Sequence, residues 1–259
     1  MSTIKLDTCT INYDLDGPAG APVLVLSNSL GTSMDMWAPQ LDALRWKFQL
    51  LRYDTRGHGK STPVPGPYTI DRLGRDVLGL LDALKIERAH FCGISMGGLT
   101  GLWLGVNAPE RLNKLVVSNT AARIGTAEGW QDRARLVRDE GMPEVADGAA
   151  SRWFTPHFIQ HQPELVDMLL RQLRSSPQAG YAACCDALEK ADLRQDVARI
   201  SVPTLVISGR HDPVTTTEDA RYLVEQIAGS KGVELDASHL SNVEAAAEFN
   251  RAVVDFLLA

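Results

Sequence analysis

The stretch that decides the fold is Ala89-His90-Phe91-Cys92-Gly93-Ile94-Ser95-Met96-Gly97-Gly98. Its first half is short and largely apolar, as in a buried strand, and apolar residues at helical spacing follow its second half. The halves meet in a Gly-x-Ser-x-Gly motif from Gly93 to Gly97. A serine on a sharp strand-to-helix turn has crowded backbone angles, so its neighbours must lack bulk. The pattern therefore predicts such a turn with Ser95 at its apex.

A turn of this kind equips a serine hydroxyl for attack on a carbonyl. It lifts the hydroxyl clear of the sheet and aims the first free N–H groups of the next helix at the reaction centre. A hydroxyl is a weak nucleophile and its attack creates an oxyanion, so both a base and hydrogen-bond donors are needed. Chance alone produces this motif in a chain of this length with a probability on the order of 0.1. The partners of Ser95 therefore decide its meaning.

Composition excludes several classes of protein. The 259 residues are 44% hydrophobic and carry a net charge of −6, which suits one large domain and argues against nucleic acid or an anionic membrane surface as a partner. No apolar run approaches a membrane span, and the N-terminus has no apolar core of the kind a signal peptide needs. We read the cysteines as reduced thiols of a cytoplasmic protein, with no metal-ligand spacing: Cys9, Cys92, Cys184 and Cys185. We expect no cofactor and no metal.

Hydrophobic patterning predicts an α/β protein. Residues 2–16 alternate apolar and polar as in a hairpin, and strands then alternate with helices up to residue 118. That alternation predicts a mostly parallel sheet with helices on both faces. Buried strands are expected over 22–26, 48–53, 89–94 and 115–118, and helices over 36–44, 70–84 and 94–108.

The alternation stops after the sixth strand. Residues 121–190 contain no predicted strand, and a break is expected at 152–156. We interpret this stretch as a helical cap laid over one edge of a core formed by residues 1–120 and 191–259. Its predicted helical segments are 130–138, 142–153, 163–173 and 178–188, and after it strands (203–208, 232–235) and helices (220–227, 243–258) alternate again.

Three polar residues directly follow predicted strands, in the order Ser95, Asp212 and His239. The carboxyl ends of parallel strands meet at one edge of a sheet, so these side chains are expected to lie together. In that arrangement His239 takes the proton of Ser95, and Asp212 holds the imidazole in the right tautomer and stabilises its charged form. Taken singly, Asp212 also fits a turn before Pro213, and His239 also fits a helix entry.

Two backbone N–H groups are predicted to bind the oxyanion. Met96 follows the nucleophile, and Leu30 lies on the loop after the first long buried strand. A rival acid after the strand ending at Ser118 is excluded, because Asn119 stands there and carries no charge.

The segment 54–61 contains Gly-Lys-Ser, which suggests a phosphate-binding loop. That motif requires a glycine five positions before Gly59, where Asp54 stands. We read its glycines as shaping a tight crossover near the serine instead.

These motifs together resemble the α/β-hydrolases over the whole chain. The resemblance rests on Asn28-Ser29-Leu30-Gly31, Asp54-Thr55-Arg56-Gly57-His58-Gly59-Lys60-Ser61, Gly93-Ile94-Ser95-Met96-Gly97-Gly98, Gly209-Arg210-His211-Asp212 and Ser238-His239. Many members have His-Gly where this chain has Asn28-Ser29, a departure that leaves the Leu30 N–H available. The resemblance implies an α/β-hydrolase fold with a helical cap.

More narrowly, the chain resembles the 3-oxoadipate enol-lactonases. This narrower resemblance rests on residues 28–32, the 54–61 loop and Arg152-Trp153-Phe154-Thr155-Pro156 in the cap. The resemblance implies a small anionic lactone as substrate and a role in the catabolism of aromatic compounds. Small esterases, carbon–carbon bond hydrolases and cofactor-free haloperoxidases share most of these motifs, and a ligand-sensing protein on a hydrolase scaffold is the alternative from another class.

Two cap residues are candidates for substrate contact. Trp153 is expected either to face the pocket and limit substrate size or to pack the cap onto the core. Arg133, on the first predicted cap helix near Trp130, is the candidate for binding a substrate carboxylate. Its alternative is a solvated ion pair with Asp132 or Glu140. The sequence does not indicate the oligomeric state.

Overall fold

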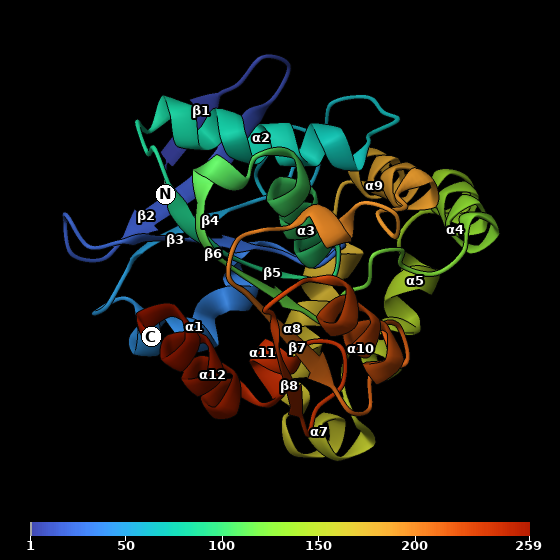
Figure 1. Ribbon diagram of the computed structural model, residues 1–259. Coiled ribbons are helices and arrows are strands. Elements are labelled where there is room, and N and C mark those ends of the chain that lie inside the picture. The colour runs from blue at the N-terminus through green and yellow to red at the C-terminus, as the bar shows by residue number, and fades with distance from the viewer. Residues whose placement is uncertain (1) are drawn as a thin grey trace.

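An eight-stranded sheet forms the centre of the computed structural model, which describes residues 2–259 (Figure 1). Its order is β1-β2-β4-β3-β5-β6-β7-β8. The strands from β3 to β8 run parallel, and β2 pairs antiparallel with both β1 and β4. The predicted mostly parallel sheet and N-terminal hairpin are therefore confirmed. The strands are β1 Ser2–Lys5, β2 Thr10–Asp16, β3 Val23–Ser27, β4 Gln49–Tyr53, β5 Ala89–Ile94, β6 Leu112–Ser118, β7 Thr204–Gly209 and β8 Lys231–Leu235.

The register of the central strands brings their carboxyl ends into one row. Ser27 at the end of β3 pairs with Gly93, and Ile94 at the end of β5 pairs with Ser118. Ser118 in turn pairs with Ile207, two residues before the last residue of β7. The loops that leave these strands therefore start side by side, and they carry the polar residues singled out in the sequence.

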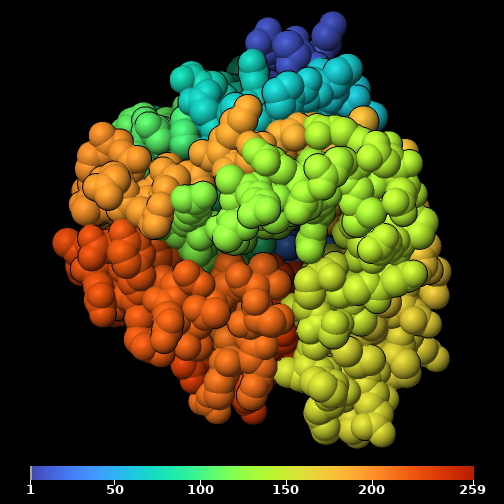
Figure 2. Space-filling view, turned by 90° about the vertical axis from the view of Figure 1, so that its right-hand side faces the viewer, coloured from blue at the N-terminus to red at the C-terminus, as the bar shows by residue number. Residues whose placement is uncertain are grey.

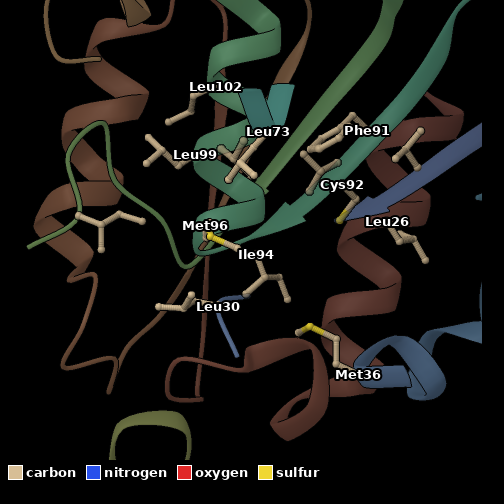
Figure 3. Close-up of a cluster of buried hydrophobic side chains, with 14 of the residues drawn as sticks. Leu26, Leu30, Met36, Leu73, Phe91, Cys92, Ile94, Met96, Leu99 and Leu102 are labelled. Carbon is tan, nitrogen blue, oxygen red and sulfur yellow. The ribbon is translucent and has the colours of Figure 1, made fainter. Parts of the chain in front are cut away.

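Helices cover both faces of the sheet. In Figure 1, α2 (Ile70–Ala83) and α3 (Met96–Asn107) lie on one side, whereas α1 (Ala38–Leu44) and α12 (Ala246–Leu258) lie on the other. The apolar strands are buried between these layers, and every residue of β5 is buried. Figure 3 shows part of this core, where side chains from α2, α3 and β5 gather: Leu73, Leu99, Leu102 and Phe91.

The turn from β5 to α3 has the predicted crowding. A Cβ on Gly93 would lie 2.2 Å from the carbonyl oxygen of Gly97, and a Cβ on Gly97 would lie 2.3 Å from that of Ser27. Ser95 has a φ of 56°, in the left-handed region that L-residues rarely occupy. The two glycines are thus required because backbone, rather than movable side chains, fills the space around them.

The segment between β6 and β7 contains six α-helices in the part of the chain that the structure describes. We call them the inserted helices. In Figure 1 they lie at the right-hand side and the bottom of the sheet. They are α4 Ala127–Glu140, α5 Pro143–Asp147, α6 Ala149–Trp153, α7 Pro156–His161, α8 Pro163–Arg174 and α9 Gln178–Lys190.

Two helix predictions were wrong in detail, and one helix, α7, was not predicted. The single helix predicted over 142–153 is divided at Gly148 into α5 and α6. The break predicted at 152–156 is confirmed, since α6 ends at Trp153, but the unpredicted α7 follows it at once. Thr155 caps α7 by accepting a hydrogen bond from the Phe158 N–H, and Pro156 occupies the first turn. The last helix is likewise divided at Ala245 into α11 (Ser241–Glu244) and α12. Helical periodicity continues across such breaks, so it does not reveal them.

Among residues 2–259, no helix combines the length and the apolar character that crossing a bilayer requires.

The crowding at the turn from β5 to α3 predicts that one added methyl group strongly lowers the stability of the fold. Gly97→Ala should lower the free energy of unfolding by about 3 kcal/mol or more, because the new Cβ would meet backbone. Gly105→Ala, in the same helix, meets only the side-chain ends of Ile200 and Leu115 at 3.2 Å and should change stability by less than about 1 kcal/mol. Urea unfolding measures both, and equal stability of the two variants would contradict this account of the turn.

Candidate active site

The structure brings the three predicted residues together at the carboxyl edge of the sheet. Ser95 follows β5, Asp212 follows β7, and His239 follows β8. The Nδ1 of His239 lies 2.8 Å from Oδ2 of Asp212, and Ser95 and His239 line the same cavity. All three side chains are nearly buried, since none of these residues exceeds 6% exposure. The arrangement can remove a proton from a hydroxyl and hold the resulting imidazolium next to a carboxylate.

The carboxylate of Asp212 accepts hydrogen bonds on both oxygens. Its Oδ1 accepts from the backbone N–H groups of Val214 and Thr215, at 2.7 and 3.1 Å. Besides His239, its Oδ2 contacts the Asn119 amide at 3.0 Å and the Thr215 hydroxyl at 2.8 Å. Burial alone would raise the pKa of Asp212, but attraction to the positive charge of His239 and these hydrogen bonds hold that pKa below its ordinary value. Asp212 is therefore kept ionised beside His239.

Asn119 contacts Asp212, which its place in the sequence alone did not reveal. It was considered only as a rival acid, but its amide nitrogen donates to both Asp212 and the Ser238 carbonyl oxygen, at 3.0 and 3.1 Å. Its amide oxygen accepts from the hydroxyls of Ser118 and Ser241, at 2.8 and 2.6 Å. The available signal was its place directly after β6, the strand next to β7.

The backbone around Ser95 is held on both sides. Its N–H donates to the Ser118 carbonyl oxygen at 2.9 Å, and its own carbonyl accepts from the Thr120 hydroxyl at 2.8 Å. Ser95 also occupies the N-cap position of α3 without making a side-chain capping bond. Its hydroxyl therefore makes no capping hydrogen bond to the first turn of α3. The next residue, Met96, begins α3 and so has one of the N–H groups at the helix N-terminus.

Leu30 lies where the second oxyanion donor was expected. Ser29 and Leu30 line the cavity together with Ser95. The Ser29 carbonyl oxygen accepts from both the N–H and the hydroxyl of Thr32, at 3.2 and 2.8 Å. Because a trans peptide places C=O and N–H on opposite sides, these bonds also orient the Leu30 N–H.

The cavity has a volume of about 380 Å³ and lies between the core and the inserted helices. It opens on the face drawn in Figure 2, where a hollow separates the green and yellow atoms of the inserted helices from the orange and red atoms of the C-terminal part. Trp130, Trp153 and Tyr181 supply its large aromatic walls. Trp153 therefore does face the pocket, although only 6% of it is exposed.

Arg133 and Arg152 line this cavity, and only Arg133 was expected from the sequence. Arg133 lies over the ring of Trp130, with its guanidinium carbon 5.4 Å from the ring centroid. Among residues 2–259, Arg133 forms no ion pair with Asp132 or Glu140, the alternative partners, and Asp132 pairs with Arg135. The missed residue is Arg152, whose guanidinium donates to the Val145 carbonyl oxygen at 2.8 Å.

The environment of Arg152 is electropositive. Its pKa is lowered from the ordinary value by burial and then by the charge of Arg133. Among residues 2–259, neither arginine makes an ion pair with an acidic side chain. Two guanidiniums in one cavity have the charge and the donors that can bind a carboxylate.

The inserted helices are bonded directly to the loop that carries His239. The Leu240 N–H donates to the Trp153 carbonyl oxygen at 3.0 Å. Glu244 accepts from the Ser238 N–H at 2.8 Å and from the hydroxyl of Thr155. Both neighbours of His239 are thus tied to other elements, which restrains the backbone on each side of the imidazole.

The Gly-Lys-Ser segment wraps around Asp54. The carboxylate of Asp54 accepts from the backbone N–H groups of Lys60 and Met34, each at 2.9 Å, and a Cβ on Gly59 would lie 2.3 Å from it. This is the tight crossover predicted for these glycines. Across the described chain, no three His, Cys, Asp or Glu side chains gather as a metal site, and the four cysteines are free and buried.

The environment of Asp212 predicts an acid-sensitive contribution to stability. Its folded pKa lies below the ordinary value near 3.9, so its ionised form stabilises the fold above about pH 5, and this contribution is lost as pH falls through the folded pKa. The stability difference between wild type and Asp212→Asn should therefore be larger at pH 6 than at pH 4, as measured by urea unfolding. The difference for Asp167→Asn, an exposed control on α8, should stay constant. A pH-independent difference for Asp212 would contradict the assignment.

Comparisons with known proteins agree with this fold. The family model described as alpha/beta hydrolase fold matches residues 22–246. The chain is 51% identical to 3-oxoadipate enol-lactonase 2 of Acinetobacter baylyi, over 97% of this chain and 94% of that protein. It is 45% identical to 3-oxoadipate enol-lactonase 1 of the same organism, over 93% and 90%.

Solved structures give the same answer. The enol-lactonase from Burkholderia xenovorans LB400 superimposes with a TM-score of 0.98 and is 48% identical, with full coverage of both chains. A thermophilic esterase from Thermogutta terrifontis superimposes with a TM-score of 0.93 at 26% identity, covering 99% and 98% of the two chains. The fold and these matches show that the chain belongs to the α/β-hydrolase family and is a hydrolase.

Proposed function

We propose that this chain opens a small enol-lactone that carries a carboxylate, namely 3-oxoadipate enol-lactone, to give 3-oxoadipate. One observation carries the proposal: Ser95 and the Asp212-bonded His239 share a cavity with two arginines that lack acidic partners among the described residues. The names and identities of the Acinetobacter and Burkholderia relatives support the same substrate. We place the activity in the catabolism of aromatic compounds, and the cytoplasmic location stays a prediction.

In the first step, the Ser95 Oγ attacks the ring carbonyl while His239 takes the hydroxyl proton. The Leu30 and Met96 N–H groups stabilise the oxyanion. Collapse of this intermediate breaks the ring C–O bond and releases an enolate, which is a better leaving group than an alkoxide. The enolate takes up the proton from the His239 imidazolium, which makes the imidazole neutral again, and the product becomes the ketone. The ketone stays attached because the acyl group is part of the same molecule.

In the second step, water attacks the acyl-enzyme. His239 takes the proton of this water, and the breaking Ser95 ester bond receives a proton back from the imidazolium. The net reaction adds one water molecule to the lactone and yields the keto acid. Asp212 holds the imidazole through Nδ1 during both steps, with Asn119 and Thr215 holding Asp212.

The carboxymethyl arm of the lactone needs a local cation, since the chain as a whole carries a net charge of −6. We assign this role to Arg133 and Arg152 together. Trp153 and Trp130 close the apolar walls around the ring, and the bulk of Trp153 limits substrate size. Residues 121–190 act in this proposal as a cap over the core of residues 1–120 and 191–259.

Removal of the nucleophile should abolish turnover without unfolding the chain. Ser95→Ala should lower kcat on the enol-lactone by a factor of about 10⁴ or more. Ser151→Ala, an exposed serine of α6, is the control and should keep wild-type kcat. Circular dichroism confirms that both variants fold. A Ser95→Ala variant that keeps more than about a tenth of wild-type turnover would refute the assignment.

The arginines should matter for the charged arm of the substrate. Arg152→Gln and Arg133→Gln should each lower kcat/KM on the carboxymethyl lactone by about 10-fold or more, and should affect the same ring without its carboxylate much less. Arg135→Gln on the same α4 helix, whose partner is Asp132, should change neither value. Equal losses of kcat/KM on the two lactones would show that the arginines do not bind the carboxylate of the substrate.

Wild-type rates on the two lactones test the substrate itself. The proposal predicts a kcat/KM advantage of at least ~10²-fold for the anionic lactone. Faster action on aryl esters or on carbon–carbon cleavage substrates would leave a serine hydrolase of another specificity. Failure to turn over any of these would favour the ligand-sensing alternative.

A further inference from the structure

His58 is a fully buried histidine that the reaction above does not use. Its Nε2 lies 3.0 Å from the backbone nitrogen of Gly31, the residue after Leu30. A backbone N–H can only donate, so Nε2 must accept and carries no proton. The proton of the neutral ring is then on Nδ1, which lies 3.3 Å from the Arg56 carbonyl oxygen.

The surroundings of His58 favour this neutral form. Burial lowers the pKa of His58, and the Arg56 carbonyl and the charge of Asp54 offset that effect only in part. From α9, the Cys184 thiol lies 4.0 Å from Nδ1, and the ring of Tyr181 lies 6.3 Å away between centroids. A protonated ring would point an N–H at the Gly31 N–H and break the contact.

Leu30 and Gly31 lie on the loop after β3, and Gly31 is the residue at which the backbone of this loop rotates most freely. Its φ is +78°, and a Cβ there would lie 2.4 Å from Leu173 Cδ1 and 3.0 Å from the ring of Tyr181. Glycine tolerates this conformation, but it also offers little resistance to rotation of the adjoining peptide. The Leu30–Gly31 peptide therefore needs an external anchor, and the His58 Nε2 is positioned to be one.

Two peptide groups flank the Cα of Leu30, and each has its own anchor. Thr32 holds the Ser29–Leu30 peptide through the Ser29 carbonyl oxygen, at 2.8 Å from its hydroxyl. His58 holds the Leu30–Gly31 peptide through the Gly31 N–H, at 3.0 Å. With both planes held, the Leu30 N–H keeps one direction before substrate arrives, which is the condition for electrostatic preorganisation.

We propose that His58 is a positioning residue of the oxyanion hole, which acts as a neutral hydrogen-bond acceptor for the Gly31 N–H. The inference rests on the proposed function, since it requires Leu30 to bind an oxyanion formed at Ser95. The 54–61 loop then contributes to catalysis through His58, in addition to forming the tight crossover around Asp54.

Substitutions that keep or remove the acceptor test this role. His58→Gln places an amide oxygen near the position of Nε2, whereas His58→Leu fills space without an acceptor. His58→Leu should lower kcat about 100-fold with KM changed by less than about threefold, because one oxyanion donor loses its orientation. His58→Gln should recover kcat to within about 10-fold of wild type. Cys184→Ala, which alters the opposite side of the ring, should keep wild-type kcat.

Ligand affinity separates positioning from packing. A trifluoromethyl ketone forms a tetrahedral adduct with the serine and so reports on the oxyanion hole. Its affinity should fall in His58→Leu in parallel with kcat/KM, whereas the affinity for the product 3-oxoadipate should stay unchanged. Equal impairment of His58→Gln and His58→Leu, or unchanged kcat in His58→Leu, would overturn the proposal.

A measurement on the wild-type protein covers the case in which His58→Leu does not fold. Nitrogen-15 NMR of labelled histidine should show the His58 proton on Nδ1 and none on Nε2, and a proton on Nε2 would overturn the inference. Ser95→Ala separates the two proposals. If it is inactive while His58→Leu has normal kcat, only the role of His58 fails, and if it is active, the proposed function itself fails.

Discussion

The close approach of α3 to the ends of β3 and β5 is the constraint on which the site depends. Backbone atoms of Ser27 and Gly97 come so near that a single methyl group on Gly97 would lie 2.3 Å from the Ser27 carbonyl oxygen. This contact sets Ser95 at a φ of 56° and points the first turn of α3 at the cavity. Strained backbone persists only where its surroundings determine it, and here the sheet, Ser118 and Thr120 hold it from several sides.

A chain of polar contacts extends from this turn across the edge of the sheet. Asn119, directly after β6, joins Asp212 from the loop after β7 to the Ser238 backbone after β8. Every member is buried and hydrogen-bonded, and a low local dielectric makes such fully satisfied networks rigid. Residues far apart in the sequence thereby hold His239 in one orientation.

The inserted helices do more than cover the cavity. Trp153 supplies both an aromatic wall and, through its carbonyl oxygen, a hydrogen bond to Leu240 beside His239. Thr155 reaches the same loop through Glu244. The segment 152–156 therefore shapes the pocket through Trp153 and also restrains the loop that carries the His239 imidazole.

The sequence by itself determined the fold class, the turn at Ser95 and the order of Ser95, Asp212 and His239. Each of these features has a local signal in the sequence. Apolar runs mark the buried strands, small residues mark the crowded turn, and the three polar residues directly follow strands. Only the tertiary structure revealed Asn119, Arg152 and the contact of His58 with Gly31. These roles arise between segments 27 to 93 residues apart, or from a cavity wall built by several helices. A side chain's partners at that separation are set by how the layers pack, and no local pattern encodes them.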